Sequence, residues 1–228
     1  MSEVSIAVPN SKIYENSAYV DYITSAFIAM FFTGLSYFVA IYFGWIESMN
    51  LLEVFAVFTS YACTWLCVKQ RRFNYVLGIV SSVAYAVLFW QQDLLASMVL
   101  NAYLAPTLIY GWFRWNKDVD SRPVENLKWK MVPVYAVVTA VVYAGALALI
   151  TAFGGQLATL DAAILIGSVL AQFLLDNKKL QNWIVWAVVN ILAIYVYSKA
   201  GLYLVAFQYV LFLANTVYGY FSWKRIMA

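Results

Sequence analysis

Long apolar segments separated by short polar connections make up most of the chain. Several of these segments approach about 20 residues, the length with which an α-helix crosses the hydrocarbon layer of a membrane. The pattern predicts about eight membrane-spanning helices in an all-α polytopic membrane protein. The expected spans are residues 22–46, 51–68, 75–90, 94–113, 131–152, 162–176, 183–198 and 202–222.

The basic residues indicate how these helices are oriented. If the spans alternate in direction, all of the 14 Lys and Arg residues except Lys199 fall on the same side of the membrane. Basic residues accumulate in short cytoplasmic loops, so both termini are expected in the cytoplasm. Adding or removing one central helix would scatter the basic loops over both sides, and the charge pattern therefore also supports the count of eight.

The sequence contains an internal repeat. "YGWFRW" at residues 110–115 and "YGYFSW" at residues 218–223 lie near the ends of the fourth and eighth spans, and the same offset aligns Asn74 with Asn182. Three spans, a linker span at 131–152 and three further spans then form two parallel three-helix repeats (3+1+3), with one additional N-terminal helix. In transporters built from such repeats, the substrate site lies between the halves, near the membrane midplane.

This layout divides the chain into five parts. The expected parts are a cytoplasmic N-terminal segment at 1–20, an additional transmembrane helix at 21–47, a first three-helix repeat at 48–116, a cytoplasmic loop and linker helix at 117–155, and a second three-helix repeat with a short cytoplasmic tail at 156–228. The first part has neither a basic start nor a small-residue cleavage site, so no signal peptide is expected.

Composition narrows the class of protein further. With 64% hydrophobic and 11% charged residues, a soluble domain would leave far too much apolar surface exposed. The net charge of +3 follows from the cytoplasmic loops, so contacts with membrane lipids are expected and a nucleic-acid partner is not. Cys63 and Cys67 share a helical face, but the chain has no His to complete a metal site, and both are expected to be packing thiols.

Ionisable residues are absent from the middle of every expected span. Glu53 and Asp176 lie near span ends, and Asp21, Asp93 and Asp161 lie at boundaries. Proton relays and ion-coupled carriers generally need ionisable groups within the membrane, so passive transport is favoured. A retinal pump is excluded because the last span has no Lys for a Schiff base. We expect no catalytic residue, cofactor or metal, and therefore no enzyme.

"NWIVWAVVN" at residues 182–190 places polar and aromatic side chains on one side of the seventh span. Trp183, Trp186 and Asn190 follow one another at steps of three and four residues, which keeps them on one helical face. Trp183 is close enough to the cytoplasmic end to belong to an interfacial aromatic belt. Trp186 and Asn190 lie deeper and are expected to face the interior of the protein.

Other spans contribute uncharged polar residues to the same region. In the eighth span Gln208, Asn215 and Tyr218 share one face, while Gln172 and Asn101 come from the sixth and fourth spans. An amide in hydrocarbon needs a partner. These residues therefore either form hydrogen bonds between helices, worth about 0.6–2 kcal/mol each, or line a cavity that suits a ligand with a ring and hydroxyl groups.

The stretches "AQFLLDNKKLQNWIVWAVVN" and "LYLVAFQYVLFLANTVYGYFSW" resemble the PnuC family of nicotinamide riboside transporters, which is related in fold to the SWEET sugar transporters. The likeness extends from about residue 50 to the end of the chain. Its most specific parts are WxxW at Trp183 and Trp186, the following Asn190, and NxxY at Asn215 and Tyr218. The first half resembles the family in architecture and in "YGWFRW" rather than in site residues.

The resemblance implies uptake of nicotinamide riboside, a vitamin B3 nucleoside and NAD precursor, by facilitated diffusion across a bacterial inner membrane. It also implies a homotrimer and trapping of the product by phosphorylation in the cytoplasm. The pyridinium ring of this nucleoside is cationic, and aromatic faces hold a cation for about 0.5–2 kcal/mol. The substrate-binding residues it implies are Trp183 and Trp186 at the ring, Asn190, Gln172 and Asn215 at polar groups, and Tyr218 and Asn101 as further candidates.

Two features leave alternatives open. Gly111 and Gly219, within the repeated hexapeptides, either permit close helix contact or act in a gate. Relatives of this architecture carry thiamine, riboflavin or deoxynucleosides, and thiamine is also cationic and aromatic. A receptor or assembly subunit that does not transport would use the same polar residues for packing alone.

Overall fold

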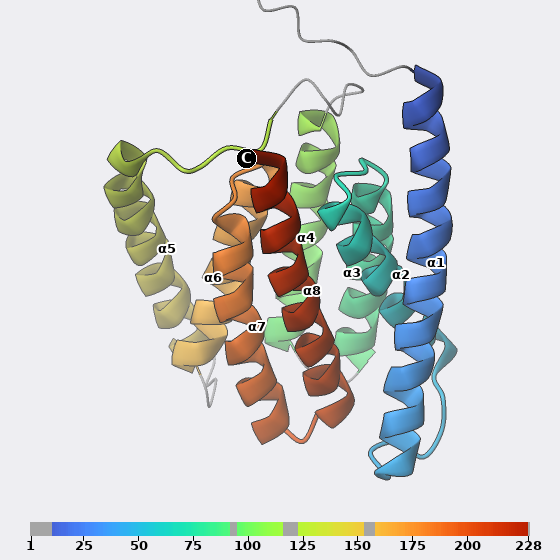
Figure 1. Ribbon diagram of the computed structural model, residues 1–228. Coiled ribbons are helices and arrows are strands. Elements are labelled where there is room, and N and C mark those ends of the chain that lie inside the picture. The colour runs from blue at the N-terminus through green and yellow to red at the C-terminus, as the bar shows by residue number, and fades with distance from the viewer. Residues whose placement is uncertain (1–10, 92–94, 116–122, 153–157, 228) are drawn as a thin grey trace, which may run out of the picture.

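The computed structural model describes residues 11–91, 95–115, 123–152 and 158–227. Within these residues the chain forms eight α-helices and one short 3-10 helix, and extended chain pairs at a single isolated bridge. The predicted all-α fold is confirmed. The elements are α1 Ser11–Tyr42, α2 Leu51–Val68, α3 Asn74–Gln91, α4 Leu95–Arg114, η2 Trp129–Met131, α5 Val132–Ala152, α6 Ala158–Asp176, α7 Asn182–Lys199 and α8 Tyr203–Met227 (Figure 1).

The first helix differs most from the apolar pattern. It covers Ser11–Tyr42, so the expected span of 22–46 is wrong at both ends. Gly44 sets the C-terminal end, because its φ of +66° belongs to a Schellman motif in which the Trp45 N–H donates to the Ala40 carbonyl at 2.8 Å. The chain therefore turns before the apolar stretch ends.

Two later helices are also longer than the apolar pattern predicts. α6 begins at Ala158 rather than residue 162, and α8 continues to Met227 rather than ending at residue 222. The additional turns carry charge: Asp161 in the first turn of α6, and Lys224 and Arg225 in the last turn of α8. Acidic residues near helix N-termini and basic residues near C-termini complement the helix dipole, so the helices continue beyond their apolar portions.

Seven of the described helices are long and apolar enough to cross a membrane, judged by length and composition. α4 is not among them; its 20 residues include Asn101, Pro106 and Thr107. α4 nevertheless packs within the bundle, against α3 and α6. The eighth crossing stays a prediction.

Six helices form a closed ring. α3 lies between α2 and α4, and α7 lies between α6 and α8. The ring closes at two seams, where α2 packs on α8 and α4 packs on α6. α5 lies outside the ring beside α6, and α1 lies outside it against α2 and α8 (Figure 1). Exchanging α2 for α6, α3 for α7 and α4 for α8 leaves this contact pattern unchanged, as a repeat of three helices requires.

We call one end of the bundle the basic end. It holds the C-terminus and the turns that join α2 to α3 and α6 to α7 (Figure 1). The described basic residues of these turns and helix ends are Lys69, Arg71, Arg72, Arg114, Lys178, Lys179, Lys224 and Arg225. Which side of a membrane this end faces stays a prediction.

Local geometry at the basic end recurs at the predicted offset. Gln70 and Lys178, both in the turns, have φ values of 54° and 49°. Each turn is followed by an Asn whose side chain donates a hydrogen bond to the backbone carbonyl three residues earlier. Asn74 Nδ2 donates to the Arg71 carbonyl at 2.6 Å, and Asn182 Nδ2 donates to the Lys179 carbonyl at 2.7 Å. The parallel relation of the complete triplets stays a prediction.

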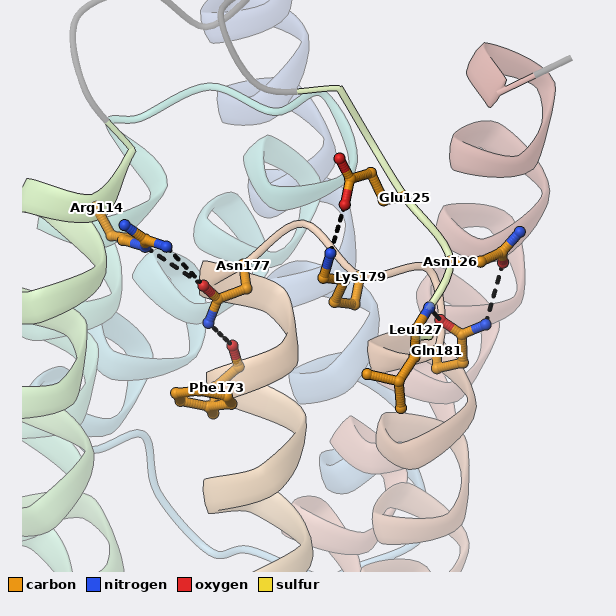
Figure 2. Close-up of polar contacts among 8 residues, drawn as sticks. All are labelled: Arg114, Glu125, Asn126, Leu127, Phe173, Asn177, Lys179 and Gln181. Atoms are coloured by element: carbon orange, nitrogen blue, oxygen red, sulfur yellow. Dashed lines mark hydrogen bonds and ion pairs between the residues drawn. The ribbon is translucent and has the colours of Figure 1, made fainter. Parts of the chain in front are cut away.

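The segment between α4 and α5, which connects the two triplets, is held against the second triplet. Glu125 pairs with the α6–α7 turn, donating its N–H to the Lys178 carbonyl at 3.1 Å and accepting from the Leu180 N–H at 2.9 Å. Lys179 Nζ lies 2.6 Å from the Glu125 carboxylate (Figure 2), and this ammonium lowers the pKa of the Glu125 carboxyl. Gln181 accepts from the Leu127 N–H at 2.8 Å.

The expected division into five parts is only partly covered. Residues 1–10 of the N-terminal segment 1–20 and residues 117–122 of the cytoplasmic loop lie outside the described residues, as does Asp93. The boundaries at 21–47, 48–116, 117–155 and 156–228 stay predictions.

Replacing Gly219 with Ala is expected to destabilise the fold. A Cβ at Gly219 would lie 2.7 Å from the Trp183 ring, which is 4% exposed and has little room to move. Overpacking of this kind lowers the free energy of unfolding by about 1–3 kcal/mol. The test is thermal unfolding in detergent.

Gly145→Ala is the matched control, since a Cβ at Gly145 would have nothing within 4 Å. It should leave the melting temperature unchanged or raise it slightly, because Ala favours helix more than Gly. Equal melting temperatures for Gly219→Ala and the unmodified protein would contradict the tight contact.

Candidate functional site

Trp183 lies in a packed aromatic cluster at the basic end. Its ring meets the edge of Trp223 at 5.3 Å and 86°, and it covers Gly219. Trp223 is fully buried and donates its Nε1–H to the Val68 carbonyl at 3.0 Å. The Trp183 ring therefore contacts its own protein on several sides. This geometry favours the packing alternative that the sequence left open for Trp183.

The first half contains the same arrangement. Tyr75 meets the edge of Trp115 at 5.1 Å and 90°, and a Cβ at Gly111 would collide with the Tyr75 ring. Both glycines thus permit close approach of an aromatic ring from the middle helix of their triplet. Any additional role in gating stays a prediction.

Trp186 is the more accessible of the two α7 indoles. It is half-buried and packs against an apolar cluster with members from α4, α6, α7 and α8, including Leu100, Ile164, Val189 and Ala206. No ring contact is recorded for Trp186 within the described residues, in contrast to Trp183. Its cluster includes residues from both halves, and a ligand contact at Trp186 stays a prediction.

Asn190, one turn further along α7, joins α7 to α8. It is 3% exposed, and its Nδ2 donates to Thr216 Oγ1 at 3.0 Å. Thr216 in turn donates to the Phe212 carbonyl at 2.8 Å. Thr216 directly follows Asn215 but was not among the predicted site residues. A polar contact that links two helices is what the interhelical alternative predicts, so Asn190 as a ligand contact stays a prediction.

Asn215 and Tyr218 lie at the seam between α8 and α2. Asn215 Nδ2 donates to the Thr64 carbonyl at 3.2 Å. Tyr218 stacks on Trp65 with ring centroids 5.4 Å apart and planes 5° from parallel. Lys69 Nζ lies 5.1 Å from the Trp65 centroid and 5.8 Å from that of Tyr218. Because a cation of the protein already occupies these aromatic faces, the Tyr218 face is poorly placed to hold a cationic ligand.

Gln172 belongs to a buried network near the second seam. Its Nε2 donates to Asp176 Oδ1 at 2.8 Å, and the Tyr75 hydroxyl donates to the same oxygen at 2.8 Å. Asp176 is 2% exposed and ends α6. The sequence places Asp176 near a span end but gives no signal for its bond to α3. At the surface of this seam, Arg114 donates to Asn177 Oδ1 at 3.1 Å (Figure 2).

Asn101 forms its recorded side-chain hydrogen bond within its own helix. Its Nδ2 donates to the Ser97 carbonyl of its own helix at 2.9 Å. Side chains that bond the carbonyl four residues earlier are satisfied without any partner from a neighbouring helix. A role of Asn101 in binding stays a prediction.

Two hydrogen bonds across the ring were not predicted. The Tyr85 hydroxyl on α3 donates to Gln208 Oε1 on α8 at 2.7 Å, and the Ser97 and Tyr197 hydroxyls join α4 to α7 at 3.2 Å. The helix pairs α3–α8 and α7–α4 are equivalent under the exchange of triplets. Gln208 was visible in the sequence as part of the polar face of the eighth span, whereas Tyr85 had no distinguishing pattern.

The recorded grooves lie outside the ring. One follows α1 beside Gly34, and the other lies between α5 and α6, lined by residues such as Tyr143 and Gly167. Neither is lined by a predicted site residue. Within the described part of the chain, no cluster of three His, Cys, Asp or Glu side chains could hold a metal ion.

Three curated relatives are named nicotinamide riboside transporter PnuC. The Escherichia coli K12 protein is 21% identical over 196 residues, covering 72% of this chain and 80% of its own. The Neisseria mucosa protein is 27% identical, covering 75% and 71%. The Haemophilus influenzae protein is 29% identical, covering 72% and 75%.

A solved structure and a family model extend these findings. A crystal structure of the vitamin B3 transporter PnuC has a TM-score of 0.72 at 24% identity, covers 89% of this chain and 91% of its own, and shows that the fold is shared. Residues 50–225 match the sequence model of the family described as nicotinamide mononucleotide transporter. The matched range runs from α2 almost to the end of α8. The chain therefore belongs to the nicotinamide mononucleotide transporter family, in agreement with its predicted PnuC resemblance.

Proposed function

We propose that this protein carries nicotinamide riboside across the bacterial inner membrane by facilitated diffusion. The observation that carries the proposal is the family match over the whole six-helix ring, together with relatives that bear this substrate in their names. In the proposed orientation the basic end and both termini face the cytoplasm, in accord with the clustering of Lys and Arg. Phosphorylation by a separate enzyme traps the product, and the protein itself catalyses no reaction.

Trp186 is the proposed contact for the nicotinamide ring. It is half-buried, lies among side chains from both halves and stacks on no other described ring. Asn190, Gln172 and Asn215 are proposed to bind the ribose and carboxamide. On binding, each of these side chains would replace its present hydrogen bond with one to the ligand. Asn190 would release Thr216, Gln172 would release Asp176, and Asn215 would release the Thr64 carbonyl. Trp183 then supports the site by packing, and Tyr218 and Asn101 are weaker candidates.

Trp186→Ala is expected to weaken binding of labelled nicotinamide riboside by about 2- to 30-fold, which corresponds to 0.5–2 kcal/mol for a cation on an aromatic face. Equilibrium binding to the purified full-length protein measures the effect. Unlabelled thiamine as competitor tests the main alternative substrate, and displacement by thiamine at lower concentration than by nicotinamide riboside would reassign the ligand.

Trp129→Ala is the matched control for this substitution. Trp129 is 88% exposed and lies in η2, outside the ring, so its loss should leave affinity unchanged. No saturable binding to the unmodified protein, or full affinity in Trp186→Ala, would contradict the proposed site.

Transport is expected to be passive. Glu53, Asp161 and Asp176 are the acidic residues of α2 and α6, and all lie within the first or last turn of their helix. In proteoliposomes held at zero membrane potential, the internal substrate concentration should reach the external one and stop there, with or without a pH gradient. Accumulation above the external concentration when a pH gradient is imposed would contradict facilitated diffusion.

We propose that the basic end contains a gate. The Tyr75–Asp176 bond joins the two halves there, and a Cβ at Gly111 would collide with Tyr75 and lie 2.6 Å from Asp176 Oδ1. Gly111→Ala should therefore change the transport rate in proteoliposomes while the affinity in detergent stays the same. Gly145→Ala serves as control, and equal loss of rate and affinity would reject the gate.

A homotrimer is the proposed assembly. α5 packs on the ring at α6, and none of its residues is buried within one chain. An apolar helix with this much free surface is available for contact with a second copy or with lipid. Light scattering in detergent measures the protein mass of the complex.

A further inference from the structure

The additional N-terminal helix has no role in the proposed function so far. α1 runs along the outside of the ring and packs against both helices of the α2–α8 seam (Figure 1). One apolar cluster contains Ala29 of α1 and Tyr61 of α2, with Phe212 of α8 packed against it. A second contains Ala40 of α1 and Leu204 of α8. α8 therefore packs against a surface that α1 and α2 form together.

Polar contacts attach α1 to the first half. Arg71, in the turn between α2 and α3, donates from Nε to Asp21 Oδ2 and from Nη2 to Ser17 Oγ, both at 2.6 Å. Further along α1, the Ser25 hydroxyl donates to the Ala62 carbonyl of α2 at 3.1 Å. The Arg71 side chain is only 7% exposed, and removing the partner of a buried charge is strongly unfavourable. α1 and the first half are therefore expected to move as one body.

The contacts of α8 at this seam extend from one end of the bundle to the other. Away from the basic end, Trp45 in the turn after α1 lies 5.6 Å from Tyr203 at the start of α8, measured between ring centroids. At the basic end, the fully buried Trp223 of α8 donates to the Val68 carbonyl of α2 at 3.0 Å. Opening this seam would therefore separate α8 from two helices at once.

The α4–α6 seam is held differently. α5, the other helix outside the ring, packs on α6, whereas α1 packs on both helices of its seam. Near the basic end, the Tyr75 hydroxyl donates to Asp176 Oδ1 at 2.8 Å, and Arg114 Nη2 donates to Asn177 Oδ1 at 3.1 Å (Figure 2). The Arg114 side chain is exposed, so water can replace its bond to Asn177 when the helices separate. Separation here does not require α1 to leave either of its partners.

We infer that α1 holds the α2–α8 seam as a hinge and that the two halves separate at the α4–α6 seam during transport. The inference rests on the proposed function, which requires the ring to open. It gives a function to the helix outside the repeat, and it makes the two seams unequal where the repeat alone would predict equal ones. Gly111 of the proposed gate belongs to α4, a helix of the seam that opens.

Reversible cross-links in proteoliposomes test the inference. Cys63 and Cys67 are first replaced with Ser, which keeps the donor that Cys67 directs at Asn74 Oδ1. In the full-length protein, Arg114→Cys with Asn177→Cys then allows a bifunctional methanethiosulfonate reagent to join α4 to the end of α6. Uptake of labelled nicotinamide riboside is expected to stop on cross-linking. Binding of the same ligand in detergent should persist, and cleavage by a reductant should restore the uptake rate.

Two pairs that involve α1 serve as matched cross-links at the hinge. Tyr22→Cys with Phe73→Cys joins α1 to the first half, where the two exposed rings lie 6.0 Å apart. Trp45→Cys with Tyr203→Cys joins the turn after α1 to α8. Either cross-link should leave the uptake rate unchanged. Each rate is compared before and after the reagent in the same variant, and Arg114→Cys alone controls for modification of a single thiol.

The possible outcomes separate the inference from the proposed function. Undiminished uptake after complete cross-linking of α4 to α6 overturns the inference. So does a reversible loss of uptake after the cross-link between Trp45→Cys and Tyr203→Cys, because α8 must then leave α1 during transport. Mass spectrometry of the intact protein measures the extent of each cross-link. An unmodified protein that takes up no nicotinamide riboside overturns the proposed function, and the inference with it.

Discussion

The close contact between an aromatic ring and a glycine determines how the helices meet at the basic end. Gly111 receives the ring of Tyr75, and Gly219 receives the ring of Trp183. A side chain at either glycine would separate the helices of its triplet. With the contact in place, Trp223 reaches the Val68 carbonyl on α2 and Tyr75 reaches Asp176 on α6. The bonds that hold the two halves together thus depend on packing inside each half.

The two halves share a backbone arrangement but differ in chemistry at equivalent positions. Val68 and Asp176 each end the first helix of a triplet. Val68 offers its carbonyl to Trp223, whereas Asp176 offers its carboxylate to Tyr75, and the Nε1 of Trp115 has no hydrogen-bond partner among the described residues. A ring with two similar seams therefore has one that contains a buried carboxyl group and one that does not. Motion at the two seams need not cost the same free energy.

The sequence predicted the helices well because each contains a nearly continuous apolar run. It missed the end of α1, since the apolar run continues past the turn at Gly44, and it missed polar turns at the ends of α6 and α8. Hydropathy predicts which residues lie in the hydrocarbon layer, but it does not predict the residue at which a helix ends. The helix at 94–113 was expected from its apolar run, but its packing against α3 and α6 cannot be derived from hydropathy.

The candidate site was predictable as a set of residue types on a face, but not in its contacts. Spacing placed Trp183 and Trp186 together, yet the structure gives them different surroundings, because Trp183 meets Trp223 and Gly219 from another helix. Likewise, Asn101 bonds its own helix, whereas Asn190 bonds Thr216 on the next. Helical periodicity identifies the face of one helix, and only packing decides which neighbour that face meets.

The distribution of charge makes the two ends of the bundle electrostatically different. Basic residues gather at one end, while Glu53 in the first turn of α2 lies near the other. A cation is repelled by the positive potential of the basic end. Between these ends, uncharged aromatic and amide groups can hold a cation without binding it strongly. In the proposed facilitated diffusion such moderate affinity is needed, because a deep binding site in the middle of the path would slow release on the far side.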